Sequence, residues 1–109
     1  MDPKELYEQI ADDLCAQNDD VEEAKMMGMP CLKRNGKMFA GYFTRGGAQA
    51  MTFKLAEEAD RANALALDGA QLFDPSGQGR PFKEWVQVPA EHQARWPELA
   101  TQALRHPAG

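Results

Sequence analysis

The dipeptide Asn35-Gly36 constrains the fold of this chain more than any other feature of its sequence. Both residues tolerate positive φ, and a two-residue type I′ turn between antiparallel strands needs that backbone at both central positions. Apolar stretches, "MPCLKR" and "KMFAGYF", flank the dipeptide. The sequence therefore predicts an antiparallel hairpin closed at positions 35 and 36, in which Leu32 faces Phe39.

The predicted hairpin is apolar on both of its faces, because successive side chains of a strand point to opposite sides. One face carries Leu32, Phe39 and Phe43. The other face carries Met29, Cys31, Met38, Ala40 and Tyr42. A strand pair of this kind is normally covered on both sides. Helices can cover one side, so we expect further chain or a second subunit to cover the other, and a symmetric homodimer is the commonest way to supply a second subunit.

The rest of the chain alternates between helical and strand patterns. Leu6, Ile10 and Leu14 recur every four residues after Asp2-Pro3, which predicts an amphipathic helix with Asp2 as its N-cap. One strand interrupted at Gly28 and Pro30 is expected over 22–34, and the other predicted strands are 37–43, 50–56, 71–73 and 82–89. Further helices are expected over 57–70 and over 90–104, where Pro97 kinks or restarts the helix.

These elements follow one another as α-β-β-β-α-β-β-α with short connections between strands. Short connections favour an antiparallel sheet, and helices would then pack on one face of it. We therefore expect residues 1–109 to form a single α+β domain, a two-layer sandwich with a mainly antiparallel sheet.

Charge is divided along the chain. Residues 1–23 contain nine acids and one base, whereas residues 24–54 contain six bases and no acid. Lys33, Arg34 and Lys37 surround the predicted turn. These cations could contact phosphates, or they could lie beside the chain's own acidic segment or block unwanted pairing between sheets. The overall acidity of the chain, whose net charge is −5, favours the second interpretation.

No catalytic or metal-binding motif is readable in the sequence. Cys15 and Cys31 form no CxxC motif, and they are expected to be reduced packing residues. His92 and His106 have no cysteine or paired acid at ligand or triad spacing. No cofactor is expected. The N-terminal segment lacks a basic region and a continuous apolar region, so we expect a cytoplasmic protein.

Three stretches carry a family resemblance: "KMMGMPCLKRNGKMFAGYF", "MTFKL" and "LFDPSGQGRPFKEWVQVP", the last followed by a helix that contains a tryptophan. Together they resemble the TfoX N-terminal-domain-like family and, more distantly, the YjbR/MmcQ-like proteins. The resemblance runs from about Val21 to Leu104. It implies a small two-layer fold like that of the secretion chaperones, usually without known enzymatic activity. Founding members regulate natural competence and carry a separate C-terminal domain, for which we expect no counterpart in this chain.

The leading functional hypothesis is a non-enzymatic domain that acts by protein–protein contact, with regulation as one role open to it, and forms a homodimer. Its candidate contact residues are Lys33, Arg34, Lys37, Arg80, Lys83 and Trp85. The alternative is a nucleic-acid-binding transcriptional or competence regulator that uses the basic 33–37 hairpin. A third hypothesis places a small-ligand or enzymatic site at the glycine-rich loop "DPSGQGRP", in a pocket that converges on Arg80.

Overall fold

The computed structural model describes residues 2–26, 28–45, 47–74 and 83–105. Within these ranges the chain forms three α-helices, one 3₁₀-helix and six strands. In chain order they are α1 (Pro3–Gln17), β1 (Val21–Met26), β2 (Met29–Arg34), β3 (Lys37–Arg45), β4 (Ala48–Lys54), α2 (Glu58–Leu65), β5 (Gln71–Leu72), β6 (Trp85–Pro89), η1 (Ala90–Arg95) and α3 (Trp96–Arg105).

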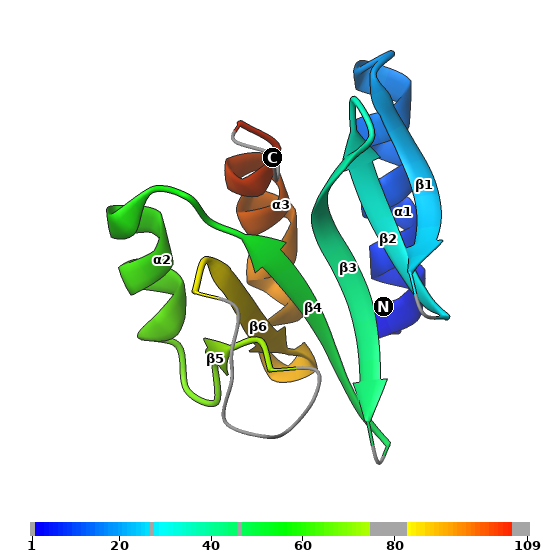
Figure 1. Cartoon of the computed structure of the whole chain (residues 1–109). Coiled ribbons are helices and arrows are strands. Elements are labelled where there is room, and N and C mark those ends of the chain that lie inside the picture. The colour runs from blue at the N-terminus through cyan, green and yellow to red at the C-terminus, as the bar shows by residue number, and fades with distance from the viewer. Residues whose placement is uncertain (1, 27, 46, 75–82, 106–109) are drawn as a thin grey trace.

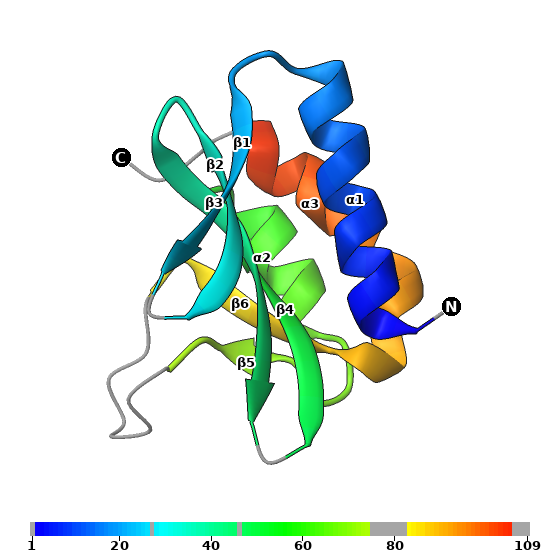
Figure 2. The same cartoon turned by 90° about the vertical axis from the view of Figure 1, so that its right-hand side faces the viewer.

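All six strands join one antiparallel sheet in the order β1-β2-β3-β4-β6-β5 (Figure 1). Helices α1 and α3 lie together on one face of this sheet, as Figure 2 shows from the side of the β1 edge. The predicted α+β architecture with helices and sheet in two layers is therefore confirmed.

The stretch 22–34, predicted as a single interrupted strand, is instead a hairpin of β1 and β2. Met26 of β1 lies opposite Met29 of β2, so the chain reverses within two residues. Gly28 has a φ of 82° at this reversal, a backbone conformation that glycine adopts at little cost. Four strands rather than three consequently precede α2, because this glycine forms a turn and not a bulge.

The turn at Asn35 and Gly36 is present, with φ values of 52° and 77°. The predicted pairing of Leu32 with Phe39 is wrong, because the register shifts between Leu32 and Lys33, and Leu32 lies opposite Ala40. β3 has one more residue than β2 at this irregularity, which is typical of a β-bulge. The shift moves Leu32 to the sheet face that Ala40 and Tyr42 share.

That face packs against the helices. The rings of Tyr42 and Tyr7, the latter on α1, lie 5.5 Å apart. Trp96 is fully buried at the start of α3, and its indole N–H donates to the carbonyl of Val88 at 3.2 Å. Pro97 follows it in the first turn of α3, so the predicted restart of the last helix after η1 is confirmed.

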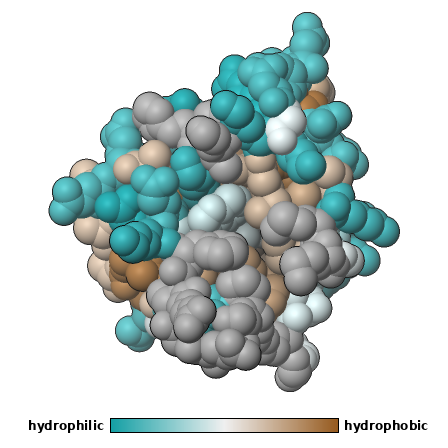
Figure 3. All heavy atoms as spheres, in the orientation of Figure 1, coloured by the Kyte–Doolittle hydropathy of each residue, from teal (hydrophilic) through white to brown (hydrophobic). Residues whose placement is uncertain are grey.

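The sheet face opposite the helices, seen in Figure 3, carries a tan strip of moderately hydrophobic residues among hydrophilic ones. On it Cys31 and Thr52 are fully buried, and Phe73 packs edge-on against Phe43 with 5.3 Å between ring centroids. Among the described residues, the large apolar side chain that is exposed is Leu65, in α2. At Cys31 this face is fully buried within the single chain, so there the further chain that we expected as one of two possible covers is sufficient.

The β1–β2 reversal yields a stability prediction at Gly28. We expect Gly28→Ala to lower the free energy of unfolding by about 1 kcal/mol, because alanine pays a steric penalty at positive φ. No atom lies within 4 Å of an added Cβ there, so packing should not contribute. Gly28→Asn, which tolerates this backbone better, should cost roughly half as much. Urea unfolding measures both. Equal stability of Gly28→Ala and wild type would contradict the turn.

Candidate functional site

The tip of the β2–β3 hairpin does not present three free cations. The guanidinium Nε of Arg34 donates to Asp20 Oδ2 at 2.9 Å, and Nη1 donates to the carbonyl oxygen of Leu104 at 3.3 Å. Asp20 directly precedes β1, and Leu104 lies in the last turn of α3. Arg34 therefore connects three elements of the fold, and its cation is already paired within the chain.

The other two cations of the tip are separated from each other. Lys33 is half-buried and lies opposite Glu22 of β1, whereas Lys37 is exposed at the first position of β3. Since neighbouring side chains in a strand alternate, Lys33 and Arg34 point to opposite faces of the sheet. The acidic segment that precedes the basic one in sequence thus becomes its neighbour in the sheet, which explains the division of charge.

The predicted contact residues of the C-terminal half lie elsewhere. Trp85 begins β6, is 9 % exposed and pairs with Lys54 of β4. Lys83 is exposed, and with Arg61, Glu84 and Trp85 it lines a wide, shallow hollow. Two strands, β3 and β4, separate this region from β2 in the sheet. The five predicted residues that the structure describes therefore do not form one site, and Arg80, with most of the glycine-rich loop, lies outside the described residues.

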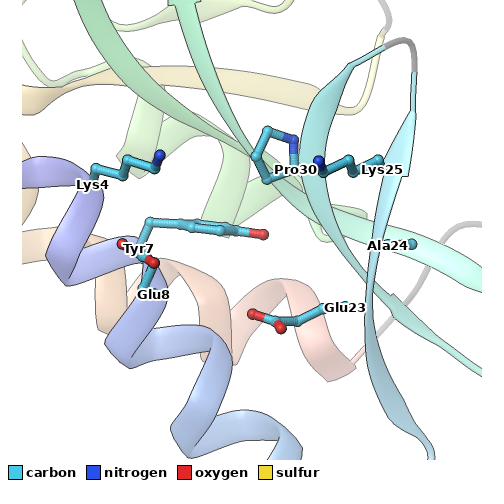
Figure 4. A pocket seen from close by; sticks show the side chains of 7 residues that line it. All are labelled: Lys4, Tyr7, Glu8, Glu23, Ala24, Lys25 and Pro30. Carbon is cyan, nitrogen blue, oxygen red and sulfur yellow. The ribbon is translucent and has the colours of Figure 1, made fainter.

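A better-defined cavity lies between α1 and the β1 edge of the sheet. It has a volume of about 320 Å³. It is lined by Lys4, Tyr7, Glu8, Glu23, Ala24, Lys25 and Pro30. Figure 4 shows Tyr7 projecting from α1 across this space, with Glu23 reaching toward α1 from β1. We call this cavity the α1–β1 groove.

The α1–β1 groove combines an apolar floor with charges of both signs at its rim. Tyr7 is buried, whereas Lys4, Glu8, Glu23 and Lys25 are exposed. Burial, reinforced by the nearby Cys31 and Glu23, raises the pKa of the Tyr7 phenol. The hydroxyl therefore stays neutral at ordinary pH, where it can donate a hydrogen bond but cannot act as a base.

The sequence pattern did not predict this groove, because a single strand over 22–34 contains no separate edge strand. A turn at Gly28 makes β1 a separate strand at the edge of the sheet, and it brings Glu23 and Lys25 beside the first helix. Gly28 lies between two runs of strand-forming residues, and this pattern predicts a hairpin as well as an interrupted strand.

Neither cysteine has the environment of a reactive thiol. Both are free, with Cys31 buried and Cys15 half-buried. Burial raises the pKa of the Cys31 thiol, an effect that Lys33 partly opposes. Burial and the nearby Glu23 raise the pKa of Cys15. Both thiols are therefore disfavoured as thiolates, which is the reactive form.

Across the described ranges, no group of three or more His, Cys, Asp or Glu residues is placed to hold a metal ion. His92, partly exposed in η1, contacts the carbonyl oxygen of Asp68 at 2.7 Å, so it fastens the segment that follows α2. None of the helices in the described part of the chain combines the length and the apolar character that a membrane crossing requires.

Comparisons with family models, with curated proteins and with solved structures found no significant match to this chain. The resemblance to the TfoX N-terminal-domain-like family therefore stays a prediction based on the three stretches quoted above.

The contacts of Arg34 predict a structural role that Lys37 does not share. We expect Arg34→Ala to lower the free energy of unfolding by about 1–2 kcal/mol, because the Leu104 carbonyl and the Asp20 carboxylate each lose a charged donor. Lys37→Ala removes a cation from the same turn and should change stability by less than about 0.5 kcal/mol. Urea unfolding of both variants measures the difference, and equal effects would show that Arg34 is not a structural tie.

The raised pKa of Tyr7 predicts a loss of stability at alkaline pH. The unfolded phenol ionises near its ordinary pKa of 10, whereas the folded one ionises only at higher pH. The contribution of the neutral Tyr7 phenol to the free energy of unfolding is therefore complete below about pH 10, and it is lost as the pH rises above that value. Urea unfolding from neutral pH to above pH 10 should show this fall. In Tyr7→Phe the free energy of unfolding should fall less steeply with pH. An equally steep fall in this variant would contradict the burial of the phenol.

Proposed function

We propose that the protein is a non-enzymatic, cytoplasmic domain that acts by protein–protein contact and resembles the TfoX N-terminal domain. The observation that carries this proposal is the position of β1. It is a six-residue strand at the edge of the sheet, it pairs with β2 on one side, and the α1–β1 groove runs beside it.

An edge strand next to a groove is a common arrangement for binding a polypeptide. A partner strand can add to the unpaired backbone groups of the edge, while alternate side chains enter the groove beside it. Tyr7 supplies an apolar surface and a neutral hydroxyl donor, and the rim of the groove offers both signs of charge. The same charges, on Glu22, Glu23 and Lys25, disfavour indiscriminate pairing with other sheets.

Nucleic-acid binding through the 33–37 hairpin has less support. Such binding depends on cations that can neutralise phosphates. Arg34 is already paired with Asp20, and Lys33 lies opposite Glu22. Lys37 is the exposed cation of this turn, and one cation supplies little phosphate affinity. A salt-dependent mobility shift that disappears in Lys33→Ala/Lys37→Ala would restore this alternative.

Photocrosslinking tests the proposed function. A photoreactive amino acid replaces Glu22, exposed on the β1 edge, and in a control variant it replaces Thr101, exposed on α3. In the cell from which the protein comes, we expect a covalent adduct with a polypeptide at position 22 and much less at position 101. The mass of the adduct measures whether the partner is another protein or a second copy. Equal yields at both positions, or no adduct, would contradict protein contact at this edge.

A further inference from the structure

We infer that the occupant of the β1 edge is a second copy of this chain, docked edge to edge in an antiparallel register centred on Ala24. This inference rests on the proposed function, since it names the partner of the same edge. It follows from which backbone groups of β1 are unpaired and from the charges of the residues that carry them.

Hydrogen bonds at the start of β1 establish which residues face outward. The N–H of Asn35 donates to the carbonyl of Asp20 at 2.9 Å, so position 20 directs its carbonyl toward β2. Antiparallel strands alternate between hydrogen-bonded and non-bonded pairs. Glu22, Ala24 and Met26 therefore direct their backbone groups toward β2. Glu23 and Lys25 direct theirs away from the sheet.

The backbone groups of Val21 also point away from β2, but its N–H is already hydrogen-bonded within the chain. It donates to the carbonyl of Asn18 at 3.2 Å, in the turn that follows α1. Within the described part of the chain, no residue pairs with the N–H and C=O groups of Glu23 and Lys25, so these groups in the middle of β1 are left for a partner.

A symmetric antiparallel pair of identical strands has a twofold axis that passes through a residue pair, so one residue must face its own copy. With Ala24 at the axis, Glu23 faces the partner's Lys25 and Lys25 faces the partner's Glu23. Both are hydrogen-bonded pairs in this register. The N–H and C=O groups of Glu23 and Lys25 in each copy are then used, and the two six-stranded sheets continue as one.

Charge selects this register over its neighbours. An axis at Glu22, Glu23 or Lys25 would place two like charges directly opposite each other, which destabilises a strand pair. The Ala24 axis places a small, uncharged side chain at the closest approach. It also places opposite charges together on both sides of the axis.

The two ion pairs would also complete the α1–β1 groove. Glu23 and Lys25 point to the face of the sheet that α1 covers, and both line the groove. The partner's Lys25 would therefore lie at the mouth of each groove, beside Glu23. Both side chains are exposed in the single chain, so we expect the association to weaken as the salt concentration rises.

Charge reversal tests the register by sedimentation equilibrium. Wild type should be dimeric at micromolar concentration. Glu23→Lys and Lys25→Glu should each weaken the dimer by roughly tenfold or more, because each creates two like-charge contacts. An equimolar mixture of the two variants should restore a heterodimer, since every pair across the axis is then opposite in charge. The double variant Glu23→Lys/Lys25→Glu should restore a homodimer for the same reason.

Glu22→Lys is the matched control. It makes the same change of charge one residue away, but its side chain points to the opposite face and lies opposite the partner's Met26 rather than a charge. We expect it to change the dimer dissociation constant by less than roughly threefold. Far-ultraviolet circular dichroism and urea unfolding of every variant check that the chain still folds.

Each outcome decides between the two proposals. A wild type that stays monomeric overturns the dimer, and an adduct with a different protein at position 22 would then leave the proposed function standing. A dimer that Glu22→Lys weakens as strongly as Glu23→Lys does, or that the charge-reversed mixture does not restore, overturns the Ala24 register. A monomeric protein that also forms no adduct at the β1 edge overturns both.

Discussion

The fold depends on one side chain that joins parts of the chain far apart in sequence. Arg34 closes the gap between the end of β2, the acidic residue before β1 and the last turn of α3. A helix C-terminus has carbonyl groups without intrahelical partners, and a cation there satisfies both the hydrogen bond and the helix dipole. Arg34 thus fastens Asp20, the residue before β1, while the pairing of β1 with β2 holds β1 at the edge of the sheet beside the α1–β1 groove.

This arrangement changes the meaning of the charge pattern. Along the sequence, a basic segment within an acidic chain could contact phosphates or lie beside the chain's own acidic segment, and the overall acidity favours the second interpretation. In the sheet, antiparallel pairing of β1 with β2 brings Glu22 beside Lys33, and the turn before β1 brings Asp20 to Arg34. Opposite charges that are consecutive blocks in sequence become neighbours in space. The other exposed charges of β1, on Glu23 and Lys25, are opposite in sign and lie on the same face of the strand.

Much of the fold could be predicted from local patterns. The stripe of Leu6, Ile10 and Leu14 predicted α1, although Asp2 caps it without a side-chain hydrogen bond. Asn35-Gly36 predicted its turn, and Trp96-Pro97 predicted the start of α3. The candidate site could not be predicted in the same way. Whether Gly28 forms a bulge or a turn depends on what β1 and β2 pack against, and a turn there creates the edge strand.

The sequence by itself determined the local elements, because turns, helix starts and amphipathic stripes depend on residues a few positions apart. Only the tertiary structure decided which cations are free, which sheet face Leu32 occupies and where the groove lies. Arg34 meets partners 14 residues earlier and 70 residues later in the chain. Contacts over such separations result from the packing of the whole sheet against α1 and α3, and no local pattern records them.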